Sequence, residues 1–107
     1  MTTFDKREEE FEKRFAHDEE LRFKATARRN KLFGLWAADK LGLSSAAAAA
    51  YAKDVVMADF EQPGDADVLG KVRRDLDAKN IAQSDADLRR TMEQLMERAI
   101  AEIRAGK

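Results

Sequence analysis

The stretch Ser84–Arg104, SDADLRRTMEQLMERAIAEIR, is the clearest guide to the fold of this chain. Its apolar residues recur every three or four positions, which is the spacing of one face of an α-helix. The stripe consists of Leu88, Met92, Leu95, Ala99 and Ile103, with Met96 and Ile100 beside it. Ser84 with Asp87 resembles a capping box in which Asp replaces the usual Glu or Gln. The stretch therefore predicts an amphipathic helix with a defined start.

Three earlier segments show the same helical spacing and supply surfaces for that helix to pack against. The first runs from Asp18 to a stop at Gly42. Its apolar face is predicted to contain Leu21, Ala25, Leu32 and Trp36, widened by Phe23, Phe33 and Leu35. The second is capped at Ser44 or Ser45, opens with the strong helix formers Ala46–Ala50 and reaches about Asp59. Its predicted inner face is Ala48, Tyr51, Val55 and Ala58.

A turn over Phe60–Gly64 separates the second segment from the third. The third segment begins at Asp65 or Asp67 and ends at Asn80, a residue that tolerates the left-handed conformation. Its apolar residues are Val68, Leu69, Val72 and Leu76. Four helices with short connections and no strand signal predict an all-α fold, a small antiparallel four-helix bundle spanning residues 18–107.

Composition limits the classes of function. The chain has 107 residues, enough for one core, and a formal net charge of −1, which argues against a general nucleic-acid binder. It has no cysteine, so thiolate catalysis and zinc–thiolate sites are excluded. No apolar run approaches the roughly 20 residues that span a bilayer, and the N-terminus lacks a secretory signal. We expect a cytoplasmic protein without direct membrane insertion.

The N-terminal segment Thr2–His17, TTFDKREEEFEKRFAH, differs from the rest of the chain. Phe4, Phe11 and Phe15 share one face of a potential helix whose other positions are almost all charged. This stripe is rotated by most of a quarter turn from the apolar face predicted for the next segment. Aromatic anchors on a charged helix are typical of a segment that enters a groove on a partner. The alternative is that these phenylalanines pack on the protein's own core.

The remaining polar residues offer little chemistry. A lone His17 cannot form a metal site, although its place between tail and bundle would suit a pH switch. The chain has no glycine-rich phosphate loop, and no carboxylate pair stands out from a solvated helix face. We therefore expect no catalytic residues, no metal and no cofactor. Three arginine doublets, at 28–29, 73–74 and 89–90, suit salt-bridged surfaces, or an anion site if they converge.

Three stretches resemble the zeta inhibitor subunit of alphaproteobacterial F-type ATP synthases: FAHDEELRFKATARRNKLFGLWAADKLGL from Phe15, AYAKDVVMADFEQPGDADVL from Ala50 and KVRRDLDAKNI from Lys71. The resemblance implies a four-helix bundle with a mobile N-terminal segment, residues 1–17, disordered or transiently helical when the monomer is free. That segment would enter an interface between catalytic and non-catalytic subunits of the synthase head, reach the central shaft and block rotation in the hydrolysis direction. The protein would then be cytoplasmic and peripheral to the inner membrane.

The resemblance places the partner contacts in the N-terminal segment. The anchors would be the three phenylalanines, with Arg7, Lys13 and Arg14 pairing with acidic groups of the head and His17 at the junction; the full set is Phe4, Arg7, Phe11, Lys13, Arg14, Phe15 and His17. The alternative is a helical binding or regulatory module, nucleotide-sensing or an adaptor, with little inhibitory activity. An inhibitor needs the segment, whereas a ligand-binding bundle does not.

Overall fold

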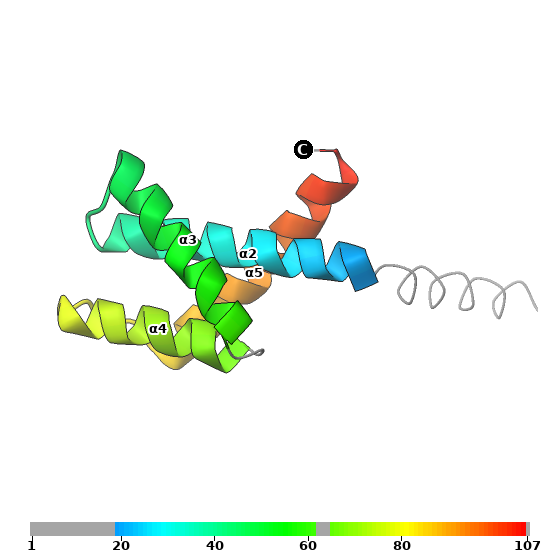
Figure 1. Cartoon of the computed structure of the whole chain (residues 1–107). Coiled ribbons are helices and arrows are strands. Elements are labelled where there is room, and N and C mark those ends of the chain that lie inside the picture. The colour runs from blue at the N-terminus through cyan, green and yellow to red at the C-terminus, as the bar shows by residue number, and fades with distance from the viewer. Residues whose placement is uncertain (1–18, 62–64, 107) are drawn as a thin grey trace, which may run out of the picture.

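The structure is a computed structural model that describes residues 19–61 and 65–106. The described residues form four α-helices and no strand: α2 (Glu19–Lys40), α3 (Ser45–Glu61), α4 (Asp65–Ala78) and α5 (Asp85–Arg104), as Figure 1 shows. The predicted all-α class and the four helices of the bundle are confirmed. The predicted mobile extension, residues 1–17, lies outside the described residues.

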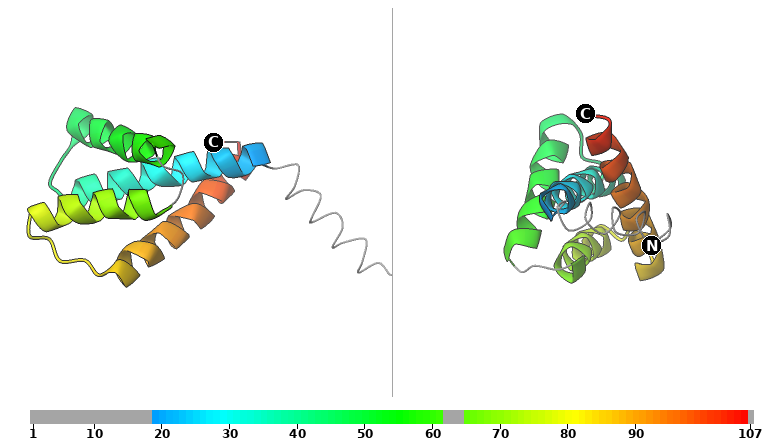
Figure 2. Two further views of the ribbon diagram at one scale, coloured as in Figure 1. Left: turned by 60° about the horizontal axis from the view of Figure 1, so that its bottom comes forward. Right: turned by 90° about the vertical axis from the view of Figure 1, so that its right-hand side faces the viewer.

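Helix α2 is the centre of the fold. It contacts α3, α4 and α5, whereas α3 and α5 do not contact each other. Figure 2 shows α3 and α5 on opposite sides of α2, with α4 alongside α2 and the chain reversing direction from each helix to the next. The contacts of α2 with α3 and α5 are the most extensive in the fold, and α4 also packs against α3.

The core combines residues from all four helices, and Phe33 of α2 is its largest fully buried side chain. Its buried members are Phe33, Ala37, Val55, Val68, Val72, Leu76, Leu88 and Met92. Trp36 stacks on Phe33 with ring centroids 5.6 Å apart and an interplanar angle of 7°. The predicted stripe of α4 is confirmed, since all of it packs in or against this core. The stripe of α5 is confirmed for Leu88, Met92 and Leu95, whereas Ile103 is only half-buried and lies outside the core.

The predicted inner face of α2 was right for Ala25, Phe33 and Trp36, but the buried face as a whole is rotated about the helix axis from the predicted one. The residues that α2 buries are Ala25, Arg29, Asn30, Phe33, Gly34, Ala37 and Ala38. Leu21, Leu32 and Trp36 are only half-buried, while Phe23 is 59% and Leu35 37% exposed. The prediction failed because small residues and an Arg–Asn pair, rather than the bulky leucines, occupy the face that α3 and α5 cover.

Helix ends follow the predicted stop signals. Gly42 and Asn80 adopt the left-handed conformation, with φ of 79° and 59°, just after α2 and α4. The Ser84 side chain accepts a hydrogen bond from the Asp87 backbone N–H, as the capping box predicts. Helix α3 starts at Ser45, where the Ser44 carbonyl accepts the first backbone bonds. It extends to Glu61, so the predicted turn over Phe60–Gly64 began two residues too early.

Helices α2 and α3 approach each other closely at Gly34. A Cβ atom at Gly34 would lie 2.6 Å from the Ala52 Cα and 3.2 Å from the Cβ atoms of Ala52 and Val55. Ala52, which the sequence-based inner face omitted, is 1% exposed. The alanine-rich sequence of α3 therefore matters for its small volume as well as for its helix propensity, because it allows backbone-to-backbone packing.

Candidate partner interface

The residues predicted to contact a partner lie outside the described residues: Phe4, Arg7, Phe11, Lys13, Arg14, Phe15 and His17. What the structure describes is the part of the fold to which they are joined. That part is the beginning of α2 at Glu19, beside which α5 ends (Figure 2). The contacts between α2 and α5 at this end hold in place the helix turn to which the N-terminal segment is joined.

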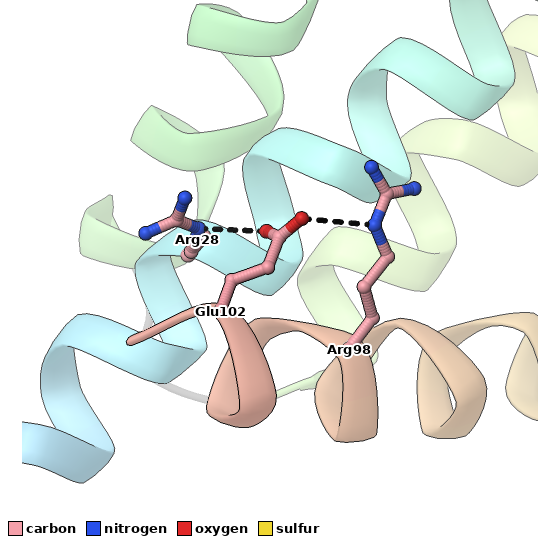
Figure 3. Close-up of polar contacts among 3 residues, drawn as sticks. All are labelled: Arg28, Arg98 and Glu102. Carbon is pink, nitrogen blue, oxygen red and sulfur yellow. Dashed lines mark hydrogen bonds and ion pairs between the residues drawn. The ribbon is translucent and has the colours of Figure 1, made fainter. Parts of the chain in front are cut away.

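A three-residue cluster fastens α2 to α5 near this end (Figure 3). Glu102 of α5 accepts a hydrogen bond from Arg28 Nε of α2 at 2.9 Å through one oxygen. Its other oxygen accepts one from Arg98 Nε at 3.1 Å, one turn earlier on α5. Glu102 and Arg28 are 22% and 32% exposed. Both oxygens of the carboxylate are therefore engaged by fixed donors, and one of the pairs joins two helices.

This cluster makes acid stability depend on Glu102. The hydrogen bonds from Arg98 and Arg28 lower the pKa of Glu102 against the opposing effect of desolvation, with the Arg98 bond the largest cause. A carboxyl whose folded pKa is depressed stabilises the fold above its unfolded value and loses that contribution as the pH falls through the folded pKa. We expect Glu102→Gln to lower the Tm at pH 7, with the difference from wild type shrinking below about pH 4.5.

The matched control is Glu97→Gln, which removes the same charge from an exposed position of α5. Thermal unfolding of the three proteins, followed by circular dichroism from pH 7 to pH 3, checks the prediction. An equal Tm loss for both variants at pH 7 would show that the cluster contributes nothing beyond general charge.

A hollow with mainly apolar lining lies between the first turns of α2 and the last turns of α5. Its volume is about 260 Å³, and Leu21, Ala25, Met96 and Ile100 line it together with Thr26 and two arginines, Arg22 and Arg104. Because α5 ends at this hollow, it does not cover the inner face of α2 beyond this point. An α-helical continuation towards the N-terminus would carry that face beyond the folded body.

The arginine doublets largely follow the salt-bridge prediction. Arg73 pairs with Asp77 and with Asp85, and Arg90 pairs with Asp87 at 3.6 Å. Arg28 pairs with Glu102. The three doublets do not converge on one point, although Arg29 and Arg89 line one hollow of about 220 Å³ with Leu69, Met92, Glu93 and Met96.

Two polar contacts, one buried and one half-buried, were not predicted by the sequence analysis. Arg29 and Asn30 are 5% and 1% exposed, and both Arg29 Nε and Nη2 donate to Asn30 Oδ1. Tyr51 donates to Asp75 Oδ2 at 2.8 Å, and burial, followed by Asp75, raises the pKa of the phenol. The burial of Arg29 could have been predicted from its position. It lies one helical turn from both Ala25 and Phe33 and so shares their buried face. The Tyr51–Asp75 bond joins α3 to α4, whereas the Arg29–Asn30 bonds lie within α2.

The described residues show neither a metal-binding cluster nor a membrane-spanning helix. No group of three or more His, Cys, Asp or Glu side chains within 19–61 and 65–106 is placed to hold a metal ion. In the same residues, no helix has both the length and the apolar character needed to cross a membrane.

Comparison with known proteins identifies the family. The family model for ATPase inhibitor subunit zeta matches residues 1–102 of this chain. The chain belongs to the ATPase inhibitor subunit zeta family. The matched range takes in the N-terminal segment as well as the four helices, and the family name implies association with ATP synthase.

A solved structure supports the fold of this zeta-family chain. A protein studied by solution NMR is 48% identical, with a TM-score of 0.71 over 81% of this chain and 99% of that one. No curated protein matches.

Proposed function

We propose that this chain inhibits ATP hydrolysis by an F-type ATP synthase and that residues 1–17 are the blocking element. The observation that carries the proposal is the zeta-family match over residues 1–102, which includes this segment. The segment enters an interface between catalytic and non-catalytic subunits of the soluble head, reaches the central shaft and stops rotation in the hydrolysis direction. The body, residues 18–107, holds the segment at the head, so the protein is cytoplasmic and peripheral to the inner membrane.

The register of the apolar residues supports a helical bound form. About five helical turns separate Phe15 from Phe33, so a helix continued back from α2 would place both on the same side. The face that α2 buries around Phe33 is thus in register with Phe4, Phe11 and Phe15, which revises the quarter-turn offset inferred from the leucines. In the bound form, the part of this face that belongs to α2 would pack on the body, and the part that belongs to residues 1–17 would pack on the partner.

The energetics explain why the segment acts only with a partner. Burying three phenylalanines contributes about 1.5–3 kcal/mol each. Ordering about fifteen residues costs about 1–2 kcal/mol apiece. The phenylalanines alone are insufficient, so the segment needs contacts along its whole length, including pairing of Arg7, Lys13 and Arg14 with acidic groups of the head. Rotation driven in the synthesis direction would then expel it, which makes the inhibition one-way.

Removal of the segment tests the proposal. A chain beginning at Asp18 keeps every residue of the core and is expected to lose inhibition of ATP hydrolysis by the purified cognate head. The full-length chain is expected to inhibit, and circular dichroism shows whether the truncated chain remains helical. Equal inhibition by both chains would move the blocking surface into the body and contradict the proposal.

A further inference from the structure

A broad groove runs along one side of α2. Its floor is a line of residues spaced by three or four positions, Lys24, Arg28, Lys31 and Leu35, which places them on one helix face. Ala27 and Leu32 border this line, while Val56 of α3 and Glu102 and Ile103 of α5 form the walls. The volume is about 780 Å³. Figure 1 shows α2 extending between α3 and the end of α5.

Two lysines of the groove, Lys24 and Lys31, carry positive charge that the described residues neutralise only weakly. Its one acidic residue, Glu102, is already shared between Arg28 and Arg98. Lys31 is exposed and forms no ion pair with any residue that the structure describes. Lys24 is 3.5 Å from Glu20, but both side chains are more than half exposed, and such a pair contributes little. The two lysines are therefore available to an acidic partner.

The same groove has apolar surface between its charges. Leu35 is 37% exposed, and Leu32, Val56 and Ile103 are only half-buried. The groove thus offers cations and apolar side chains together, bordered by α3 on one side and α5 on the other. This combination complements an amphipathic helix that carries acidic residues. A purely acidic loop would leave the apolar surface uncovered, and a purely apolar helix would leave the lysines unpaired.

We propose that this groove docks an acidic amphipathic helix on the surface of the synthase head, as a second attachment besides residues 1–17. This rests on the proposed function. The described part of α2 begins at Glu19, and the groove starts about one helical turn later at Lys24. The groove is therefore close to the point where the N-terminal segment joins the body, and the synthase head that binds the segment would also lie near the groove. Docking of the body keeps the segment at high effective concentration near its interface.

The test measures affinity and inhibition separately, with the full-length chain and the purified cognate head. The double variant Lys24→Glu, Lys31→Glu is expected to bind about tenfold more weakly and with a shallower dependence on salt, because two attractive charges become repulsive. At saturating concentration it is expected to inhibit hydrolysis as fully as wild type. The double variant Lys53→Glu, Lys79→Glu changes two exposed lysines outside the groove, is the matched charge control and is expected to bind like wild type.

A second variant probes the apolar surface without a change of charge. Leu35→Asn is expected to weaken binding about threefold or more, again with full inhibition at saturation. Thermal unfolding followed by circular dichroism checks that each variant is folded. Because one variant changes charge and the other changes apolar surface, the proposal can still be tested with one variant if the other misfolds.

Four outcomes would overturn one proposal or both. Wild-type affinity in the double variant and in Leu35→Asn overturns the groove and leaves the inhibitory segment standing. Tight wild-type binding without inhibition, weakened in the variants, overturns the proposed function and supports the groove. Absence of any wild-type binding overturns both. A wild-type dimer in sedimentation that Lys31→Glu dissociates would make a second copy of this chain the occupant, contrary to the proposal.

Discussion

Replacement of Phe4, Phe11 and Phe15 together by alanine is expected to abolish inhibition of ATP hydrolysis. Each phenylalanine contributes about 1.5–3 kcal/mol when buried at the partner. Losing all three removes about 4–9 kcal/mol, and each 1.4 kcal/mol is a factor of ten in affinity. The inhibitory constant should therefore rise at least about a thousandfold, which a titration of the head's hydrolysis rate measures.

The control for this variant is a measurement of its thermal stability. None of the three positions belongs to the core built by α2 to α5, so the Tm is expected to stay within about 3 °C of wild type, the size of a neutral surface change. Full inhibition by the triple variant would contradict the anchor assignment. A large drop in Tm would show instead that the phenylalanines pack on the body.

Gly34→Ala is expected to destabilise the fold strongly. The added Cβ would lie 2.6 Å from the Ala52 Cα, a backbone atom that cannot move without displacing α3 from α2. Overpacking of this kind costs about 1–3 kcal/mol, more than the up to about 1 kcal/mol that alanine gains in helix propensity. The net loss is up to about 2 kcal/mol, and at about 4–8 °C per kcal/mol for a domain of this size the Tm is expected to fall by up to about 15 °C.

Gly70→Ala makes the same chemical change on α4 and is expected to have the opposite sign. There the nearest atom to the added Cβ is Arg74 Nη1 at 3.7 Å, an ordinary contact with a flexible side chain. The variant should gain about 0.5–1 kcal/mol from helix propensity. Equal stabilisation by both substitutions, measured by urea unfolding, would show that the close contact at Gly34 does not constrain the helices.

Much of this architecture was predictable because local chemistry fixes helix ends. Gly42 and Asn80 stop helices by adopting positive φ, and Ser84 starts one by capping, so neighbouring residues suffice to locate these boundaries. The stripes of α4 and α5 were also recognised, because bulky apolar residues mark a single face of each helix.

The inner faces of α2 and α3 were harder to predict because burial there depends on the partner helix. Gly34 and Ala52 are buried for their small size, a property that hydrophobic periodicity does not weigh. Arg29 is buried through its bonds to Asn30, which no stripe of apolar residues signals. The groove along α2 likewise depends on how α3 and α5 flank the helix, and so requires the tertiary structure.

The central position of α2 has a mechanical consequence. Helix α2, to which the N-terminal segment is joined, lies between α3 and α5 and contacts α4 as well, so a pull along its axis would load all of these contacts. Such a load shears the contacts with all three neighbours at once instead of peeling one helix away. Under the proposed function, the body would therefore stay folded under the torque of a stalled shaft and would still be folded, and able to bind again, after the segment is expelled.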